Sequence, residues 1–160
     1  MRFVLVDRIV SIETGHRIET VTHVSGLDDV FTDHFPGYPV LPGALVVEAF
    51  AQAAQLLIAL SRDFAEVGRL RRLSRVAFRH RVRPGDRLEI LCERRGGDSR
   101  WILDATAAVA SRRVAAATLD YELEPVAPGT EAERYAQRLG ALARALSAAA
   151  DTVAARGPGE

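Results

Sequence analysis

The feature that most constrains the fold is the apolar run from Gly43 to Leu60. Its only charged or amide side chains are Glu48, Gln52 and Gln55, and at 3.6 residues per turn these three lie within about 60° of the helix circumference. A helix that is apolar on every other side has to be buried. The run is nearly as long as the roughly 20 residues of a membrane span, but its three polar residues and the strand-rich remainder of the chain favour a core helix and no membrane span.

The start of this helix is also marked in the sequence. The preceding segment, residues 26–41, is rich in Asp, Gly and Pro and is predicted to be a loop. Pro42 suits the first helical position, because its φ is already helical and its missing N–H would have no partner there. We therefore expect a helix from about Pro42 to Leu60.

Segments rich in β-branched and aromatic residues, with rough alternation, lie on both sides of this helix. Two precede the loop, with Gly15 at the turn between them, and four follow the helix, separated by short stretches of turn residues. The predicted strands are residues 3–12, 17–24, 72–82, 86–95, 101–110 and 112–123. An antiparallel sheet can bury the apolar helix by curving around it, so we predict an α+β fold.

The composition changes after Glu124. Residues 125–130 read PVAPGT, which indicates a linker, and residues 131–155 are rich in alanine with helical spacing. Apolar side chains recur there at steps of four and three, at Tyr135, Leu139, Leu142, Leu146, Ala149 and Val153. We divide the chain into a folded domain, residues 1–124, and a C-terminal extension, residues 125–160. The extension should pack on the domain, on a second subunit or on another protein; a solvated helix is the alternative.

Composition narrows the functional classes. The chain has 160 residues, enough for one domain core, and its formal net charge of zero gives no bias toward nucleic acid or an anionic membrane. Its one cysteine, Cys92, allows no intrachain disulfide, and the amino terminus lacks the apolar segment of a secretory signal. We therefore expect a cytoplasmic protein. Eight arginines from Arg69 to Arg87 form a basic concentration.

Three residues around the helix start suggest acid–base chemistry. His34 heads a proline-stiffened loop, and an imidazole titrates near neutrality, as a general base should. Glu48, if buried in the apolar helix, would hold its proton and could act as a general acid. Gly43 leaves room for a ligand oxygen to approach the N–H groups of the first helical turn. The alternatives are structural: a surface or capping histidine, and a glutamate whose carboxylate is satisfied by an arginine or by backbone N–H groups.

The segment HFPGYPVLPGALVVEAFAQAAQLL, residues 34–57, resembles the signature of the 3-hydroxyacyl-[acyl-carrier-protein] dehydratases of the FabZ type. The similarity runs from LVDRIVSIETGHRIETVTHVS through VAFRHRVRPGDRLEI to about Glu124. It implies a hot-dog fold, in which the sheet wraps the central helix. It also implies a dimer with two active sites at the interface, each using His34 of one subunit and Glu48 of the other.

The resemblance also implies a mechanism. In that family the histidine removes the α-proton of a 3-hydroxyacyl thioester, and the acidic residue protonates the departing hydroxyl, giving a trans-2-enoyl product. By the resemblance, Gly43 offers its N–H to the thioester oxygen and Gln52 helps to position Glu48. The related FabA-type enzymes, which also isomerise the double bond, have aspartate where this chain has Glu48, so we expect dehydration alone. No metal ion and no cofactor are expected.

The chain departs from the family pattern at Asp33, where glycine is usual, at Tyr38 and Leu41, and in its C-terminal extension. The expected partners are acyl carrier protein, which carries the substrate on its phosphopantetheine arm, and a second hot-dog subunit in a homodimer or heterodimer. The arginines from Arg69 to Arg87 are candidates for binding the carrier. The pathway could be fatty-acid or polyene and polyketide biosynthesis. Two alternatives remain: a non-catalytic hot-dog subunit that partners an active dehydratase, and an acyl-thioesterase.

Overall fold

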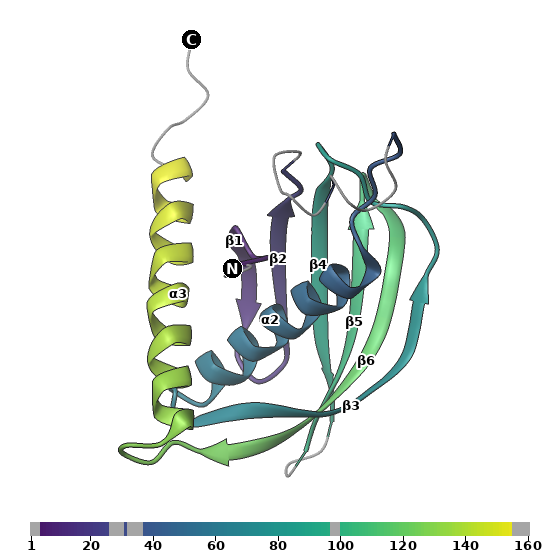
Figure 1. The fold of residues 1–160 in the computed structure, drawn as a ribbon. Helices are drawn as coiled ribbons and strands as arrows, with labels where there is room; N and C mark the ends of the chain where they lie inside the picture. Colours follow the sequence, from purple (N-terminus) through teal and green to yellow (C-terminus); the bar gives the residue numbers. More distant parts are fainter. Residues whose placement is uncertain (1–3, 26–30, 32–36, 97–99, 155–160) are drawn as a thin grey trace.

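In the computed structural model, an antiparallel sheet curves around a central helix (Figure 1). The structure describes residues 4–25, 31, 37–96 and 100–154, with side chains up to residue 147. The strands are β1 (Arg8–Glu13), β2 (Arg17–His23), β3 (Glu66–Phe78), β4 (Arg87–Arg95), β5 (Trp101–Val109) and β6 (Arg112–Pro125), and the helices are α2 (Gly43–Ser61) and α3 (Glu131–Ala154). The strand order is β1-β2-β4-β5-β6-β3. The predicted α+β fold, a curved antiparallel sheet around a central helix, is confirmed.

The concave side of the sheet buries one side of α2. Phe50 and Leu57 are fully buried there and belong to one core cluster with Leu88, Leu103 and Leu119 of three strands. Burial of each such side chain contributes about 1.5–3 kcal/mol. By length and composition α2 could span a membrane, but more than half of its most apolar window is buried inside this fold. The helix is therefore the core around which the sheet is built.

The strand after α2 differs most from the prediction. The expected strand was residues 72–82, whereas β3 begins at Glu66 and ends at Phe78. Asp63 and Phe64 both have positive φ, 48° and 59°, so the chain reverses directly after α2 and enters the sheet at once. The first half of β3 is rich in arginine and does not resemble a typical strand, so the sequence did not predict this early start. The remaining predicted strands agree within two residues, except β1, which begins at Arg8 and not at residue 3.

The C-terminal helix packs against the rest of the chain. It contacts β1, α2 and β3 and stands at the β1 edge of the sheet in Figure 1. Its buried side chains are Ala132, Ala136, Leu139, Ala143 and Leu146, whereas Tyr135 and Leu142 of the predicted seam are partly buried. The helix is thus rotated toward its alanines, which lets it lie close to its neighbours. The division of the chain at residue 124 remains a prediction.

Candidate active site

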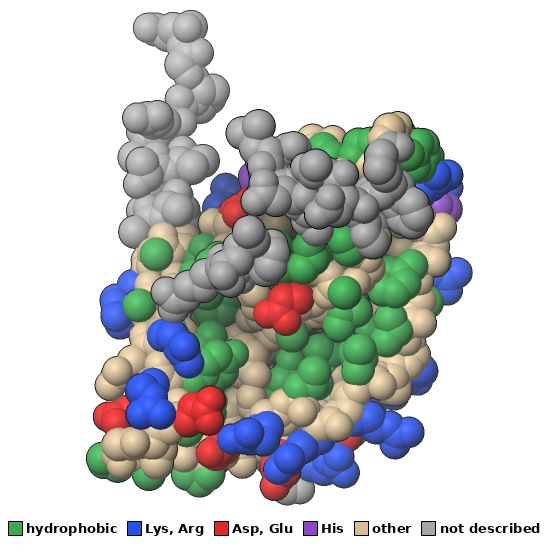
Figure 2. All heavy atoms as spheres, viewed as in Figure 1, with side chains coloured by type: hydrophobic (Ala, Val, Ile, Leu, Met, Phe, Trp, Pro, Cys, Tyr) green, Lys and Arg blue, Asp and Glu red, His purple; other side chains and the backbone are tan. Residues whose placement is uncertain are grey.

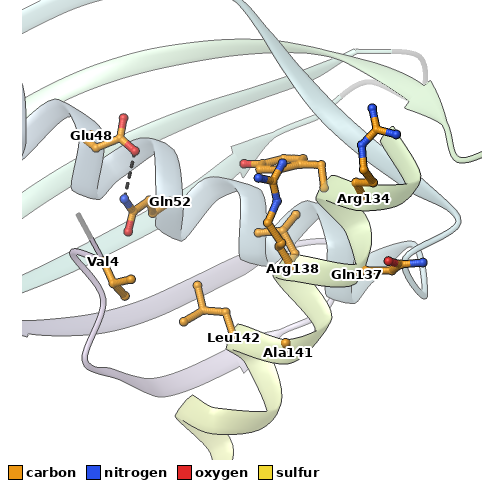
Figure 3. A pocket seen from close by; sticks show the side chains of 10 residues that line it. Val4, Glu48, Gln52, Arg134, Gln137, Arg138, Ala141 and Leu142 are labelled. Carbon is orange, nitrogen blue, oxygen red and sulfur yellow. Dashed lines mark hydrogen bonds between the residues drawn. The ribbon is translucent and has the colours of Figure 1, made fainter. Parts of the chain in front are cut away.

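A glutamate and a glutamine form a hydrogen-bonded pair on the side of α2 away from the sheet core (Figure 3). Gln52 Nε2 donates to Glu48 Oε1 at 2.9 Å, and Gln52 Oε1 accepts from the Leu5 N–H at 2.8 Å. Because the backbone N–H occupies the amide oxygen, the amide nitrogen has to face the carboxylate. Gln52 therefore holds Glu48 in place from a fixed point on the chain before β1.

The expected burial of Glu48 is wrong for the single chain, because its side chain is exposed. The three polar residues of α2 do lie on one side of the helix, but the sheet covers the opposite side. Gln55, at the other end of the stripe, is only 8% exposed, since Gly68 of β3 packs against it and accepts a hydrogen bond from its Nε2. The polar stripe of α2 is therefore exposed to solvent at Glu48 and buried at Gln55.

Gly43 is the first residue of α2, and Pro42 is its N-cap, one position earlier than the sequence predicted for proline. An N–H in the first turn has no partner within the helix. A Cβ at position 43 would lie only 2.7 Å from Cζ of Phe78, so glycine is required for this ring to lie over the helix start. Phe78 itself is 54% exposed. No pattern in the sequence marks this phenylalanine as a neighbour of the site.

An open groove of about 830 Å³ lies between α2 and α3 next to Glu48. Its volume is typical of sites that bind small molecules. In Figure 3, Glu48 and Gln52 stand on α2, while Arg138 and Leu142 project from α3 across the groove. The lining residues are Val4, Glu48, Gln52, Arg134, Tyr135, Gln137, Arg138, Leu139, Ala141 and Leu142. This wall was not predicted, because helical spacing does not reveal what a helix packs against.

Tyr135 has an electrostatic link to the proposed acid. Burial and then the charge of Glu48 raise the pKa of the Tyr135 phenol, while Arg138 acts in the opposite direction. The guanidinium of Arg138 lies over the ring, 5.7 Å from its centroid, a cation–π contact. Tyr135 is therefore a neutral phenol at physiological pH.

Most of the arginines between Arg69 and Arg87 already interact with acidic side chains or with an aromatic ring. Arg69, Arg71, Arg75 and Arg87 form ion pairs with Glu124, Glu122, Asp104 and Glu89. Two further arginines, Arg81 and Arg83, lie over the ring of Tyr38 at 4.7 and 5.5 Å from its centroid. Arg72 and Arg79 are exposed and form no ion pair with the described residues. Only part of the concentration is thus available to bind a partner.

The β3 edge of the sheet carries exposed hydrophobic side chains. Among the strands that the structure describes, β3 is the last and pairs with β6 alone. Its exposed large hydrophobic residues are Leu70, Leu73, Val76 and Phe78. Figure 2 shows hydrophobic side chains across the open face of the molecule and arginines along its lower edge. An unpaired edge with apolar side chains is a surface suited to pairing with another chain.

His34, the predicted general base, lies outside the described residues, as does Asp33 before it. The structure therefore brings together Glu48 and Gln52, places Gly43 at the start of the same helix, and does not test the position of the histidine.

The chain matches known proteins in sequence over most of its length. The domain model described as FabA-like matches residues 1–118. A relative, the 3-hydroxyacyl-[acyl-carrier-protein] dehydratase FabZ of a Nitratiruptor species, is 39% identical over 127 residues, which cover 73% of this chain and 84% of the relative.

Solved structures share the fold at lower identity. A hot-dog-like protein from Thermanaerovibrio acidaminovorans superimposes with a TM-score of 0.60 at 18% identity, over 71% of this chain and 84% of that one. A chain of the dehydratase heterocomplex ApeI:P from Xenorhabdus doucetiae gives 0.62 at 18% identity, over 76% and 83% of the two chains. The predicted hot-dog fold is confirmed.

Proposed function

Because the chain belongs to the FabZ-type 3-hydroxyacyl-[acyl-carrier-protein] dehydratases within the FabA-like family, its reaction is the dehydration of 3-hydroxyacyl thioesters, and we propose that His34 and Glu48 carry it. The observation that supports this assignment is the Gln52–Glu48 hydrogen bond at the side of a substrate-sized groove. A carboxyl group held in one position by a neighbour can transfer a proton without a large entropic cost.

In the proposed step, the His34 imidazole takes the proton from Cα of the substrate. The electron pair of that C–H bond becomes the second bond between Cα and Cβ, and the Cβ–O bond breaks. Glu48 gives its proton to the departing hydroxyl, which leaves as water, and solvent returns a proton from the imidazolium to the carboxylate. Gly43 donates its N–H to the thioester oxygen, where negative charge develops as the Cα proton leaves.

We propose a dimer, with the β3 edge as its interface. The exposed hydrophobic residues of β3 would be covered by the β3 strand of a second subunit, and the unpaired backbone groups of the edge would be satisfied. The same contact would cover the exposed side of Glu48 and bring the partner's His34 toward it. A related hot-dog chain could take the place of the second copy.

Acyl carrier protein is the proposed donor of the substrate, in a cytoplasmic fatty-acid or polyketide pathway. Arg79 is the best candidate to bind its acidic surface, because this arginine is exposed, free of ion pairs with the described residues, and next to Phe78 at the start of α2. Arg79→Glu should raise the KM for carrier-bound substrate and leave a pantetheine thioester unaffected. Arg71→Glu, at an arginine already paired with Glu122, is the matched control; equal effects on both substrates would contradict the assignment.

The reaction and its two residues are tested by following the enoyl product from a 3-hydroxyacyl thioester. His34→Ala and Glu48→Gln should each lower kcat by roughly 10²-fold or more, the usual contribution of a positioned proton-transfer group. Glu89→Gln, which changes a carboxylate in an exposed ion pair, should leave kcat unchanged. Mixing the two inactive variants should restore part of the activity in mixed dimers. Wild-type turnover in either variant would refute the role of that residue.

A further inference from the structure

The wall of the groove opposite Glu48 comes from a part of the chain that the family match does not include. The FabA-like match ends at residue 118, whereas α3 covers Glu131–Ala154 and supplies most of the lining residues. We propose that α3 forms one wall of the acyl-binding channel, and that Tyr135 and Leu142 limit the length of acyl chain that the enzyme accepts. The proposal rests on Glu48 acting at the reactive carbons.

The groove leads away from the reactive position. Glu48 lines it at one side, so a substrate whose Cβ hydroxyl lies against this carboxyl group can continue directly between α2 and α3. The part between the helices is lined by aliphatic side chains, namely Val4, Leu139 and Leu142. Arg134, Gln137 and Arg138 are exposed and therefore lie at its rim.

This lining fits the acyl chain better than the pantetheine arm. The arm carries two amides and a phosphate, which need hydrogen-bond partners when they leave water. An alkyl chain needs only apolar contact and gains from burial in proportion to the area covered. Arg79 is exposed and follows Phe78, whose ring lies against the first residue of α2. The α3 residues Tyr135 and Arg138 instead share a hollow with Gln55, in the second half of α2, so the phosphate and the alkyl chain would bind in separate places.

The groove has a defined end. Tyr135 and Arg138 also line a second, smaller hollow of about 270 Å³, so this stacked pair stands between the two spaces. Half of the residues on the far side are polar or charged, namely Gln55, Arg69, Glu124 and Glu131. An apolar chain gains little by entering such a space. The chain end should therefore stop at the ring of Tyr135.

The wall is tested by the ratio of kcat/KM for a twelve-carbon substrate to that for a four-carbon substrate, both as 3-hydroxyacyl pantetheine thioesters. Leu142→Trp adds bulk inside the groove and should lower this ratio by roughly tenfold or more, since a single misplaced methylene already changes specificity by about that factor. Ala145→Trp adds the same bulk on an exposed side of α3 that does not line the groove, and should leave the ratio unchanged. Leu142→Gln keeps the size and makes the wall polar, and should lower the ratio several-fold even if the tryptophan variant does not fold.

An unchanged ratio in both Leu142 variants would overturn the proposal, as would an equal fall in Ala145→Trp. Because the measurement is a ratio, a loss of folded enzyme does not imitate the effect. If wild-type protein turns over neither substrate, the proposed catalytic function fails separately. The wall is then judged by calorimetric binding of dodecanoyl-pantetheine, whose Kd should rise in Leu142→Trp and stay constant in Ala145→Trp; equal Kd values would refute it.

Discussion

The two helices are packed in different ways, although both lie on the same sheet. The side of α2 that faces the strands carries large side chains with no exposed surface, such as Phe50 and Leu57. The buried side of α3 carries three alanines and two leucines, all slightly exposed. Since stabilisation follows the apolar area removed from water, α2 should contribute far more to folding than α3.

The helices also differ in what they bring to the groove. From α2 come the carboxylate and the amide that holds it, and from α3 come aliphatic side chains and an aromatic ring. A chemical group has to stay in one place for the reaction to occur, whereas a wall can change as long as the core remains intact. Under the proposed assignments, chemistry and folding depend on α2, and the choice of substrate depends on α3.

The largest expected difference is in the cost of removing a core side chain. Phe50→Ala should lower the free energy of unfolding by about 3–5 kcal/mol, because it leaves a large cavity between α2 and the sheet. Leu139→Ala on α3 should cost about 2 kcal/mol, at the lower end for its type, because alanine-rich surroundings at the surface can relax. Urea denaturation of both variants measures this, and equal losses would show that α3 belongs to the core.

Removal of the whole C-terminal helix should cost about as much as Leu139→Ala. Deletion of residues 127–160 should leave a folded chain with a free energy of unfolding lower by about 2 kcal/mol. The lost burial of two leucines is partly offset, because the shortened chain no longer loses the conformational entropy of ordering this helix. Circular dichroism and light scattering on the shortened protein provide the measurement. A shortened chain that does not fold would place α3 among the elements essential to the fold.

The smallest expected effect is a gain in stability. Gly140 lies inside α3, where glycine costs about 1 kcal/mol relative to alanine, and an added Cβ would meet Phe64 and Arg144 at ordinary contact distances of 3.8 and 3.5 Å. Gly140→Ala should therefore stabilise the protein by about 0.5–1 kcal/mol. Gly68→Ala is the matched contrast and should destabilise it, because its Cβ would lie 2.6 Å from Cδ1 of Ile58 in α2. A lower melting temperature in Gly140→Ala would contradict the conclusion that α3 is packed less tightly than α2.

The fold could be predicted where local signals agree. The proline at position 42, the apolar run and its narrow polar stripe all indicated one core helix, and α2 begins and ends within one residue of the expected range. The strand β3 was placed wrongly, since its first half alternates weakly and its early start depends on the positive φ of Asp63 and Phe64. Such a backbone reversal leaves little trace in composition.

The candidate site was predictable only in part. The hydrogen bond between Gln52 and Glu48 joins residues four apart on one helix, and the family resemblance implied that Gln52 positions Glu48. The exposure of Glu48 was not foreseen, because an apolar helix suggests burial on all sides and does not show where the sheet ends. The contributions of Tyr135 and Leu142 depend on the docking of a distant helix, which no local pattern records.

The single cysteine has a practical consequence for experiments on this protein. Cys92 is fully buried in β4, and burial raises the pKa of its thiol to about 12. The thiolate is the reactive form, so the native protein should be inert toward maleimides at neutral pH. A cysteine placed on the surface, for instance at Ala145, would then be the one reactive thiol of the chain. A spectroscopic label or a cross-linker could be attached there without first removing a native residue.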